Sequence, residues 1–512
     1  MNKKCIALTL LVFIFAICVR CYWFSQKTSF HADEGFAIQI SHNNKEISKT
    51  LPEKSYLAKD LKSKIFFTSN SAINSVLKDV KELRYGSFDK LNTTFYYSLF
   101  RTAQLNQDSQ NLMQYIQRGF YLNLLIFSLS FFVMFKLLNL FDFNKNYIPF
   151  ILLVCFLNTG SISNTLLIKS YILQEFAYIL LAYVFAYNIK LLKNNSNILN
   201  IKNVLLLPLG ICISLFSGYF SLFYLAMLFI AYTVYAIKKK SYKNIGIIFG
   251  FGIISLLITF LIYPSFFSIF SVDNPTTSNS YNYFGYSPIT MIKDIFYITC
   301  KYLFYIPVLF ILAYSIFYII KNKIRLTNSL ILILVGINIF VAILSLYFGI
   351  YKVLRYVVPT FAIISLILPF LLFELNKKIR NILVSITIII YIFSSVFAKT
   401  IESPDSAIIS KENKYFPNIE NTFINTQCEP IKNAEVPILV LTKEDWQIYN
   451  ILPYMKDNQI VILNHYNKKI KALDHFIVLI GDNEVASPKD YKLLSQFNCQ
   501  RFEGYELKKI KE

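Results

Sequence analysis

The chain has 512 residues, of which 55% are hydrophobic, and its mean hydropathy is +0.47. Long runs such as 147–168 and 243–270 are apolar and almost uncharged, which indicates a polytopic membrane protein and excludes an ordinary soluble enzyme. The net charge of +21 does not indicate a nucleic-acid partner. The lysines occur in short tracts between apolar runs, which is the pattern that the positive-inside rule produces.

The N-terminus has two interpretations. It reads Met1-Asn2-Lys3-Lys4 and continues as an apolar run to about residue 24, which is typical of a cleaved signal peptide. However, the run is long, Arg20 interrupts its end, and no small-x-small cleavage site follows. We therefore expect a retained signal anchor that forms the first crossing.

At about 20 residues per crossing, the apolar runs predict eleven transmembrane helices. They are expected at 5–25, 119–139, 147–167, 171–190, 203–217, 219–236, 245–268, 296–320, 328–349, 356–374 and 381–398. The segment 203–236 could instead be one long tilted helix, which would reverse the parity of every later crossing. Two short crossings are preferred because they keep the charge asymmetry of the loops.

The charges of the connecting loops predict the orientation. A cytoplasmic N-terminus places most loop cations inside, namely Lys190, Lys193, Lys202, Lys238, Lys239, Lys240, Lys243, Lys321, Lys323, Arg325, Lys377, Lys378 and Arg380. The first loop (26–118) and the segment 399–512 then lie outside the cytoplasm. Ionisable residues within the crossings are expected near helix ends. Arg20, Lys136 and Glu374 would snorkel there, and Glu175 would pair with a nearby cation.

The first loop opens on an acidic pair, Asp33-Glu34, about ten residues after the first crossing. Carboxylates placed where membrane meets water are candidates for chemistry, although acidic residues also simply suit a helix N-terminus. A surface helix is expected at 33–40. A second, interfacial helix is expected from Ile73, Val76, Leu77, Val80 and Leu83, with Lys78, Asp79, Lys81 and Glu82 on the opposite face. The segment 92–101 is rich in aromatic residues and is expected to begin a further helix. Arg118 then stands directly before the second crossing.

This series resembles the GT-C glycosyltransferases, in the branch of the protein O-mannosyltransferases and the aminoarabinose transferase of lipid A. The shared order of motifs over residues 1–375 carries the resemblance: Asp33-Glu34, two surface helices, Tyr96-Tyr97, Arg118, Lys169-Ser170-Tyr171 and Arg355-Tyr356-Val357-Val358-Pro359. Three positions depart from the family pattern. Asn92-Thr93-Thr94 replaces His-Pro-Pro, Gly218 stands where a His is frequent, and Lys169 replaces an Arg, which would lose bidentate phosphate contact.

The resemblance implies an inverting transfer of a sugar from a polyprenyl-phosphate carrier to an envelope lipid, glycan or protein at the outer face of the cytoplasmic membrane. A lipid phosphate leaves without protonation once its charge is neutralised, so one base and several cations suffice, unlike in glycosidases. By motif position, Asp33 is predicted to be the general base. Glu34, Tyr96 and Tyr97 would position the acceptor, and Arg355, Lys352 and Lys169 would hold the donor phosphate.

Plainer interpretations of these residues remain open. Arg355 and Lys352 could anchor lipid phosphates at the interface, and Asp33 could cap a helix. Aromatic residues in the loop 271–295 could stack on a sugar or form an interfacial belt: Tyr281, Tyr283, Phe284 and Tyr286. The sequence identifies no cofactor with certainty. Asp33 and Glu34 could supply oxygen ligands to a divalent metal, but nothing nearby completes the set, and the histidines His31, His42, His465 and His475 have no matched partners.

From about residue 399 the composition becomes that of a soluble domain. Strands are expected at 436–441, 459–463, 475–480 and 502–510, and helices at 442–455 and 488–497, which together make a small α/β domain of 399–512 beside a transmembrane module of 1–398. Cys428 and Cys499 are its two cysteines, and in an oxidising compartment they could form a disulfide. The domain would cover the active site or contact the acceptor.

Two rival functions stay open, one a different enzyme and the other a protein of another class. An O-antigen polymerase or ligase is also polytopic and uses polyprenyl carriers, but it usually places its large outer loop late in the chain. A transporter or flippase of lipid-linked sugars would carry functional charges in the middle of the bundle, and the sequence places few there.

Overall fold

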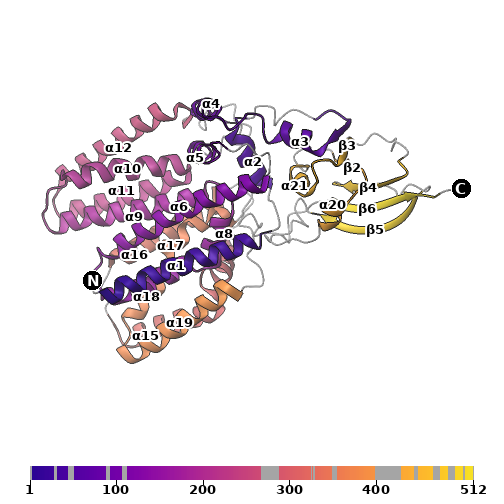
Figure 1. Cartoon of the computed structure of the whole chain (residues 1–512). Helices are drawn as coiled ribbons and strands as arrows, with labels where there is room; N and C mark the ends of the chain where they lie inside the picture. The colour runs from indigo at the N-terminus through magenta and orange to yellow at the C-terminus, as the bar shows by residue number, and fades with distance from the viewer. Residues whose placement is uncertain are drawn as a thin grey trace. The chain divides into compact units, whose positions relative to one another are not determined.

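A computed structural model describes residues 3–27, 32–43, 51–87, 93–106, 112–266, 288–324, 326, 329–348, 354–397, 428–442, 448–464, 473–481, 491–499 and 502–510. Contacts divide the chain into two compact units (Figure 1). The helical unit comprises residues 1–25, 84–96 and 120–412, and the sheet unit comprises 26–83, 97–119 and 413–512. The first loop therefore groups mainly with the C-terminal segment, because strand β1 of the loop pairs with C-terminal strand β3.

The helical unit is built almost entirely from apolar helices. Its elements are α1 (Lys3–Ser25), most of α6 (Leu112–Leu138), η2 (Lys145–Tyr147), α7 (Ile148–Phe156), α8 (Thr159–Leu166), α9 (Tyr171–Lys193), α10 (Ile201–Ser217), α11 (Phe220–Lys238), α12 (Tyr242–Ile262), α14 (Pro288–Ile298), η4 (Thr299–Leu303), α15 (Tyr305–Lys321), α16 (Ser329–Phe348), η5 (Leu354–Tyr356), η6 (Val358–Thr360), α17 (Phe361–Ile364), α18 (Ile367–Phe373) and α19 (Lys377–Phe397).

Each predicted crossing coincides with helical structure, but not every one is a straight span. Among the described residues, eight helices or helical stretches are long and apolar enough to cross a membrane. Two further predicted crossings are bent pairs: 145–166 bends by 61° and 292–321 by 109°. The remaining one, α10, is a shorter apolar helix. A membrane protein is thus established, and the count of eleven crossings stays a prediction.

The chain breaks between α10 and α11, as the preferred interpretation of 203–236 requires. Gly218 lies between the two helices with φ +153°, a conformation that side chains with a Cβ rarely adopt. The two helices then lie side by side (Figure 1). A single tilted helix over this segment is excluded.

Arg20 does not snorkel, contrary to the sequence expectation. Its side chain is fully buried and reaches the break between α7 and α8, where it donates to the carbonyl of Phe156 at 3.1 Å and to Ser161 Oγ at 3.0 Å. Its guanidinium also lies 3.7 Å from the ring centroid of Phe127. A helix break inside an apolar bundle exposes backbone carbonyls that need donors, and Arg20 supplies one.

Buried polar side chains connect neighbouring helices of this unit. Asn188 of α9 and Asn203 of α10 exchange two amide hydrogen bonds of 3.0 and 2.8 Å. Trp23 of α1 donates to the carbonyl of Ser395 in α19 at 2.8 Å. These bonds fix helix contacts in an apolar surrounding where the hydrophobic effect does not hold helices together.

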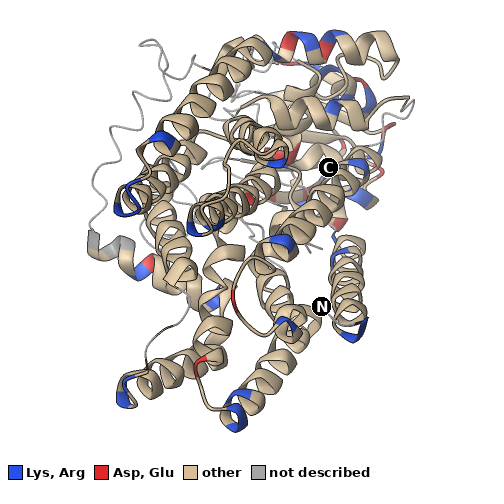
Figure 2. Ribbon diagram, turned by 90° about the vertical axis from the view of Figure 1, so that its left-hand side faces the viewer, with Lys and Arg blue, Asp and Glu red and all other residues tan. Residues whose placement is uncertain are grey.

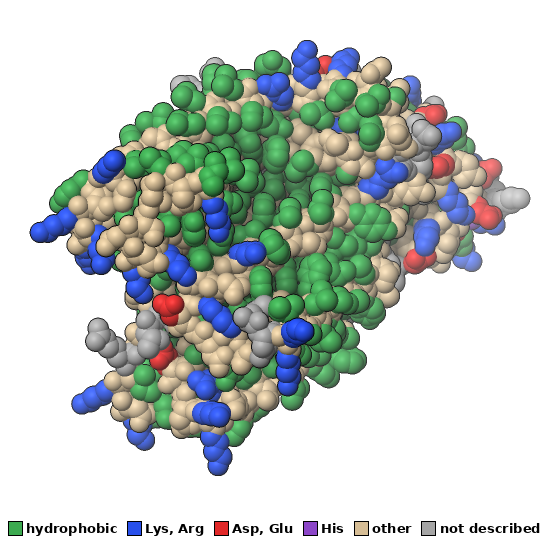
Figure 3. All heavy atoms as spheres, turned by 60° about the vertical axis from the view of Figure 1, so that its left-hand side comes forward, with side chains coloured by type: hydrophobic (Ala, Val, Ile, Leu, Met, Phe, Trp, Pro, Cys, Tyr) green, Lys and Arg blue, Asp and Glu red, His purple; other side chains and the backbone are tan. Residues whose placement is uncertain are grey.

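The outer surface of the helical unit is suited to lipid. Figure 3 shows a broad surface of hydrophobic side chains, and residues such as Leu261 and Phe310 are 68% and 73% exposed. An exposed apolar surface of this extent marks a membrane or an interface. Lys and Arg gather at helix ends that face the viewer in Figure 2. This distribution agrees with the charged loops of the sequence, while the orientation itself stays a prediction.

The sheet unit is a mixed six-stranded sheet with short helices. Its elements are α2 (Ala32–Ser41), β1 (Ser55–Leu57), α3 (Ala58–Ile65), α4 (Ile73–Leu83), most of α5 (Phe95–Ala103), α20 (Glu429–Asn433), β2 (Ile438–Leu441), α21 (Ile448–Ile451), η8 (Leu452–Tyr454), β3 (Ile460–Asn464), β4 (His475–Ile480), β5 (Tyr491–Cys499) and β6 (Phe502–Lys509). The strand order is β1-β3-β2-β4-β6-β5. The three central strands β3, β2 and β4 are parallel, and the other pairs are antiparallel.

Four predicted strands are confirmed, but the helix predicted at 488–497 is wrong. Residues 491–499 form strand β5, which pairs antiparallel with β6. The segment is apolar at helix-like spacing, yet the partner strand lies only a short turn away, and pairing satisfies its backbone. Within the predicted helix 442–455, the structure describes only the short α21 and η8, and residues 443–447 lie outside the described part.

The disulfide that the sequence left open is present. Cys428 and Cys499 are bonded across a sequence separation of 71 residues, and both are buried. The bridge joins the start of α20 to the end of edge strand β5. It closes a long loop, and such closure removes more conformational freedom from the unfolded chain than a short loop does.

Candidate functional site

The acidic pair lies where the sequence predicts it, in the first turn of α2. The two carboxylates differ in their surroundings. Glu34 is fully buried and forms an ion pair with Lys27, whose side chain is only 1% exposed, whereas Asp33 is partly exposed. Burial lowers the pKa of Lys27, and the charge of Glu34 opposes that shift. Asp33 is therefore the member of the pair that solvent or a substrate can reach.

Helix α2 rests on the C-terminal part of the sheet unit. Ala37 and Ile40 are buried, and Phe36 packs edge-on against Tyr449 of α21 at 5.8 Å. Nearby, Lys62 of α3 donates to the carbonyl of Met455 at 2.7 Å and to Asp457 at 2.8 Å. The C-terminal segment thus supports the helix that carries Asp33, a role that the sequence did not reveal.

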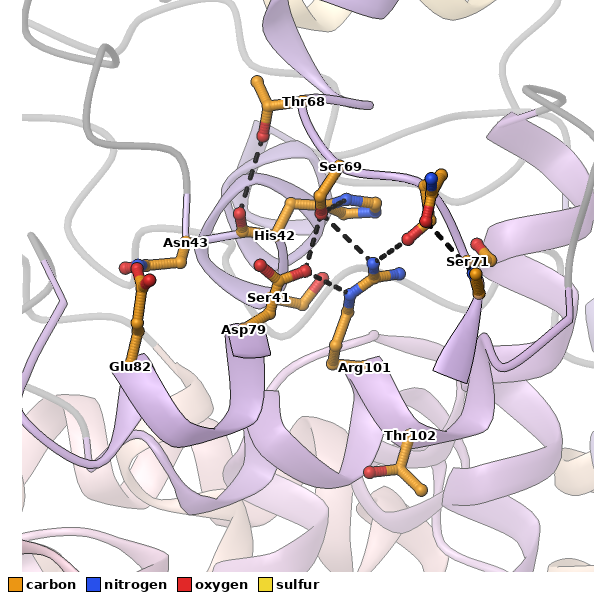
Figure 4. A network of polar contacts seen from close by, with 12 residues as sticks. Ser41, His42, Asn43, Thr68, Ser69, Ser71, Asp79, Glu82, Arg101 and Thr102 are labelled. Atoms are coloured by element: carbon orange, nitrogen blue, oxygen red, sulfur yellow. Dashed lines mark hydrogen bonds and ion pairs between the residues drawn. The ribbon is translucent and has the colours of Figure 1, made fainter. Parts of the chain in front are cut away.

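A buried polar network joins α2, α4 and α5 within the same unit (Figure 4). His42 Nδ1 lies 2.9 Å from Ser69 Oγ, and the Ser69 hydroxyl donates to Asp79 at 2.6 Å. Arg101 donates to the same oxygen of Asp79 at 2.8 Å and to the carbonyl of Asn70 at 2.5 Å. Because Ser69 gives its proton to Asp79, the set resembles a structural clamp and not an activated nucleophile.

Burial sets the protonation tendencies of this network. It lowers the pKa of His42 well below its ordinary value, and the charge of Arg101 lowers it further. It also raises the pKa of Asp79, while the hydrogen bonds from Ser69 and Arg101 oppose that shift. His42 is therefore a neutral ring held between Ser69 and the ring of Tyr115, 5.6 Å away.

Two sequence expectations are corrected by this network. Helix α4 was expected to turn Asp79 toward water, but Asp79 is buried with Val76 and Leu83 while Leu77 is 60% exposed. The helix is rotated because Arg101 gives the carboxylate a buried partner. His42 was expected to lack a partner, and its partner Ser69 comes from a loop that no short motif identifies. His475 also has one, since its Nε2 lies 2.9 Å from Glu506.

In the helical unit, Tyr96 is fully buried and bonded. Its hydroxyl donates to Asn123 at 2.8 Å, and the Asn123 amide donates to the carbonyls of Thr165 and Leu167 at 3.0 and 2.9 Å. Tyr96 therefore supports the segment that leads from α8 to Lys169. Tyr97 is also fully buried, in the sheet unit. The predicted contact of both with an acceptor stays a prediction.

Three motifs distant in sequence converge in the helical unit. Arg355 is buried, with its guanidinium 5.8 Å from the Tyr171 ring and 5.4 Å from the Tyr356 ring. The Tyr356 ring lies 6.1 Å from Tyr171 and 5.5 Å from Phe220. Lys169, two residues before Tyr171, is 4% exposed. The fold thus brings the 169–171, 219–220 and 355–359 segments to one place, with two buried cations.

Several predicted site residues lie outside the described part of the chain. These are Lys352, His31, His465, Asn92, Tyr281, Tyr283, Phe284 and Tyr286. Among the described residues, no three His, Cys, Asp or Glu side chains gather as a metal site would need. Glu34 is engaged by Lys27, so a divalent metal at the acidic pair would have to compete with that ammonium group.

Two ionisable residues of the helical unit, Arg20 and Glu175, are buried more deeply than the sequence predicts. Glu175 of α9 is fully buried and accepts from Asn164 at 2.9 Å and from Ser161 at 3.3 Å. Ser161 also accepts from Arg20, so the two charges share one hydroxyl. The expected pairing of Glu175 with a cation is thus mediated by Ser161. Both residues were predicted near helix ends because hydropathy alone does not show which way a side chain points.

A scan against protein-family models and a search of curated proteins found no match to this sequence.

Proposed function

We propose that the chain is an integral membrane glycosyltransferase of the GT-C class. It transfers a sugar from a polyprenyl-phosphate carrier to an envelope lipid, glycan or protein at the outer face of the cytoplasmic membrane, and inverts the anomeric centre. The observation that carries the proposal is the burial of Arg355 near the rings of Tyr171 and Tyr356, with the buried Lys169 two residues before Tyr171. Preorganised cations at one place suit a leaving phosphate, because they need no rearrangement when charge develops.

The proposed step is a single displacement. The acceptor hydroxyl gives its proton to the Asp33 carboxylate as its oxygen attacks the anomeric carbon from the face opposite the phosphate. The bond between that carbon and the phosphate oxygen breaks, and polyprenyl phosphate leaves with both electrons. Partial exposure of Asp33 in the first turn of α2 supports its role as base. The buried pair of Lys27 and Glu34 supports Glu34 as a residue that positions α2.

One observation favours a transporter of lipid-linked sugars as a second candidate. Arg20 and Glu175 are charged, fully buried and inside the helical bundle, as a transport pathway would require. Their hydrogen bonds go to Ser161, Asn164 and Thr165 and to backbone carbonyls. This dense bonding favours a structural pair at the α7–α8 break, so the transferase remains the better supported function.

The decisive test compares Asp33→Asn with Asp33→Glu in membrane vesicles. Labelled polyprenyl-phosphate sugars serve as donors, and release of polyprenyl phosphate and sugar transfer are both measured. We expect Asp33→Asn to lower transfer by about 10²–10⁴-fold, the usual contribution of a general base. Asp33→Glu should retain part of the rate. The matched control is Asp60→Asn, which changes an exposed acid in the first turn of surface helix α3.

Each alternative gives a different result. Movement of intact donor across the vesicle membrane without release of polyprenyl phosphate would indicate the transporter. An unchanged transfer rate in Asp33→Asn would remove Asp33 as base. In the same assay, Arg355→Gln should raise the donor KM more than the acceptor KM, and an equal effect on both would argue against a phosphate clamp.

A further inference from the structure

A cavity lies in the helical unit, and none of its lining residues belongs to the sites described above. Its volume is about 250 Å³. The α6–α7 connection, the start of α16, the end of α18 and the start of α19 form its walls. The residues that matter for its chemistry are Asp142, Phe143, Tyr147, Phe373, Glu374 and Arg380.

The cavity lies at the level where candidate membrane spans begin and end. Helix α6 ends at Leu138, α16 begins at Ser329, and α19 begins at Lys377. Lys and Arg mark helix ends of this kind in Figure 2. Such positions correspond to the boundary between hydrocarbon and lipid head groups, where aromatic rings also concentrate.

Arg380 gives the cavity an anion-binding group. Its Nη1 donates to the carbonyl of Phe373 at 3.2 Å, and its guanidinium lies 5.3 Å from the ring centroid of Tyr147, so the side chain is held in place. The side chain is half-buried and lines the cavity. A guanidinium held in this way at a cavity wall suits a phosphate oxygen.

The same cavity also contains negatively charged groups. Glu374 and Asp142 line it, and Asp142 lies 3.6 Å from Lys193 at the exposed rim. Three aromatic rings line the same cavity: the Phe373 centroid is 5.7 Å from that of Phe143 and 4.8 Å from that of Tyr147. Lys145 Nζ already lies 4.9 Å from the Phe143 ring, which shows that a ring of this cluster attracts an ammonium group. Carboxylates next to aromatic faces attract an ammonium group.

We propose that this cavity binds a phosphate ester that carries a primary ammonium group, as in the head group of phosphatidylethanolamine. The phosphate lies at Arg380 and the ammonium at Glu374 and the aromatic rings. A purely anionic group would face the two carboxylates, and a purely cationic one would face Arg380. The volume is below the roughly 300–1,000 Å³ of pockets for drug-sized ligands, which excludes a whole nucleotide sugar.

The proposal is tested on the purified full-length protein in detergent micelles by native mass spectrometry. Short-chain phosphatidylethanolamine, phosphatidylglycerol, phosphatidylcholine and free phosphoethanolamine are titrated separately. We expect phosphatidylethanolamine to bind about 10-fold more tightly than phosphatidylglycerol, which lacks the ammonium, since one charge-assisted hydrogen bond is worth about a factor of ten. Binding of free phosphoethanolamine without the lipid would support the same chemistry with a soluble source.

Variants assign the two ends of the ligand. Arg380→Gln should weaken binding of both lipids, whereas Glu374→Gln should weaken phosphatidylethanolamine and spare phosphatidylglycerol. Lys378→Gln, at an exposed position of the same helix, is the control and should change neither. Equal binding of the two lipids to the wild-type protein, or unchanged binding by Arg380→Gln, would overturn the proposal. If Arg380→Gln fails to fold, the affinities of Glu374→Gln for phosphatidylethanolamine and phosphatidylglycerol still test the proposal. An unchanged preference for phosphatidylethanolamine in that variant would overturn it.

Discussion

Asp79 shows how one buried carboxylate determines local structure. It lies on the face of α4 that the sequence assigns to water, yet it accepts hydrogen bonds from Ser69 and Arg101 inside the sheet unit. The side chain of Arg101 is fully buried, and that of Asp79 is 8% exposed. Because charge burial is tolerated only with such partners, the network fixes the rotation of α4 and its distance from α5.

Removal of Arg101 should therefore destabilise the sheet unit strongly. We expect Arg101→Met to cost about 3–5 kcal/mol, because Asp79 is then left buried without its cation. The double variant Arg101→Met/Asp79→Leu should recover most of that loss, since both desolvation penalties disappear. Thermal unfolding of the purified protein and hydrogen exchange in α4 measure the effect. A double variant no more stable than Arg101→Met would show that the pair is not coupled.

His42 should make the same region sensitive to acid. Its folded pKa is lowered by burial and by Arg101, so the unfolded region binds a proton more readily than the folded one. Stability of the region is then complete above about pH 6.5 and falls as the pH drops toward the folded pKa, by about 1.4 kcal/mol per pH unit.

The measurement is hydrogen exchange of α2, α4 and α5 amides between pH 5 and 7.5, corrected for the intrinsic pH dependence. His42→Asn keeps a polar group near the Nδ1 position but does not titrate, and it should flatten the profile. Equal pH dependence in the two proteins would assign the acid sensitivity to other groups.

Among the secondary-structure elements, β5 depends most on its neighbour. It is an edge strand whose residues are mostly exposed, and its only strand partner in the described sheet is β6. Phe497 lies over Gly504 of β6 so closely that a Cβ at Gly504 would stand 2.4 Å from the ring. The cross-strand pair and the disulfide at Cys499 together hold this edge.

A side chain at Gly504 should destabilise the β5–β6 edge of the sheet. We expect Gly504→Ala to cost about 1–3 kcal/mol, because the added methyl group overlaps the Phe497 ring and forces it to move. Phe497→Leu combined with Gly504→Ala should cost less than the single change, since the smaller side chain leaves room. The thermal unfolding of the sheet unit is measured for both variants, and equal losses would show that overlap with the Phe497 ring is not the cause.

For the whole molecule, the two units have different physical requirements. The helical unit carries exposed apolar residues over its candidate spans, which need lipid, whereas the sheet unit has a small core of Leu439, Leu441, Phe476, Val478 and Leu507. That core and the disulfide suit a water-exposed, oxidising compartment. The loop charges predict that this compartment lies outside the cytoplasm.

Orientation can be measured with an impermeant thiol reagent on intact spheroplasts. The background should lack the exposed thiols Cys18 and Cys21 and the partly exposed Cys300, while Cys428 and Cys499 stay paired. A cysteine near residue 410 should be labelled in intact cells, and Lys239→Cys should be labelled only after lysis. The reverse pattern would invert the topology and move the sheet unit to the cytoplasm.

Elements whose sequence signal is local and long can be predicted from the chain alone. Apolar runs predicted the helical segments, strand β4 at His475–Ile480 was predicted with its correct bounds, and the acidic pair was placed in the first turn of α2. The length of an apolar run and the spacing of its apolar residues are enough to predict these features, because burial in lipid or in a sheet acts on each segment separately.

The other features depend on contacts between segments that are distant in sequence. Strand β1 of the first loop joins a sheet about 400 residues away in sequence, and β5 is a strand because β6 pairs with it. Arg20 turns inward to the α7–α8 break, and Lys27 becomes the partner of Glu34. Each outcome depends on a hydrogen-bond or charge partner supplied by another segment. Composition and periodicity do not show which distant group will satisfy a strand edge or a buried charge.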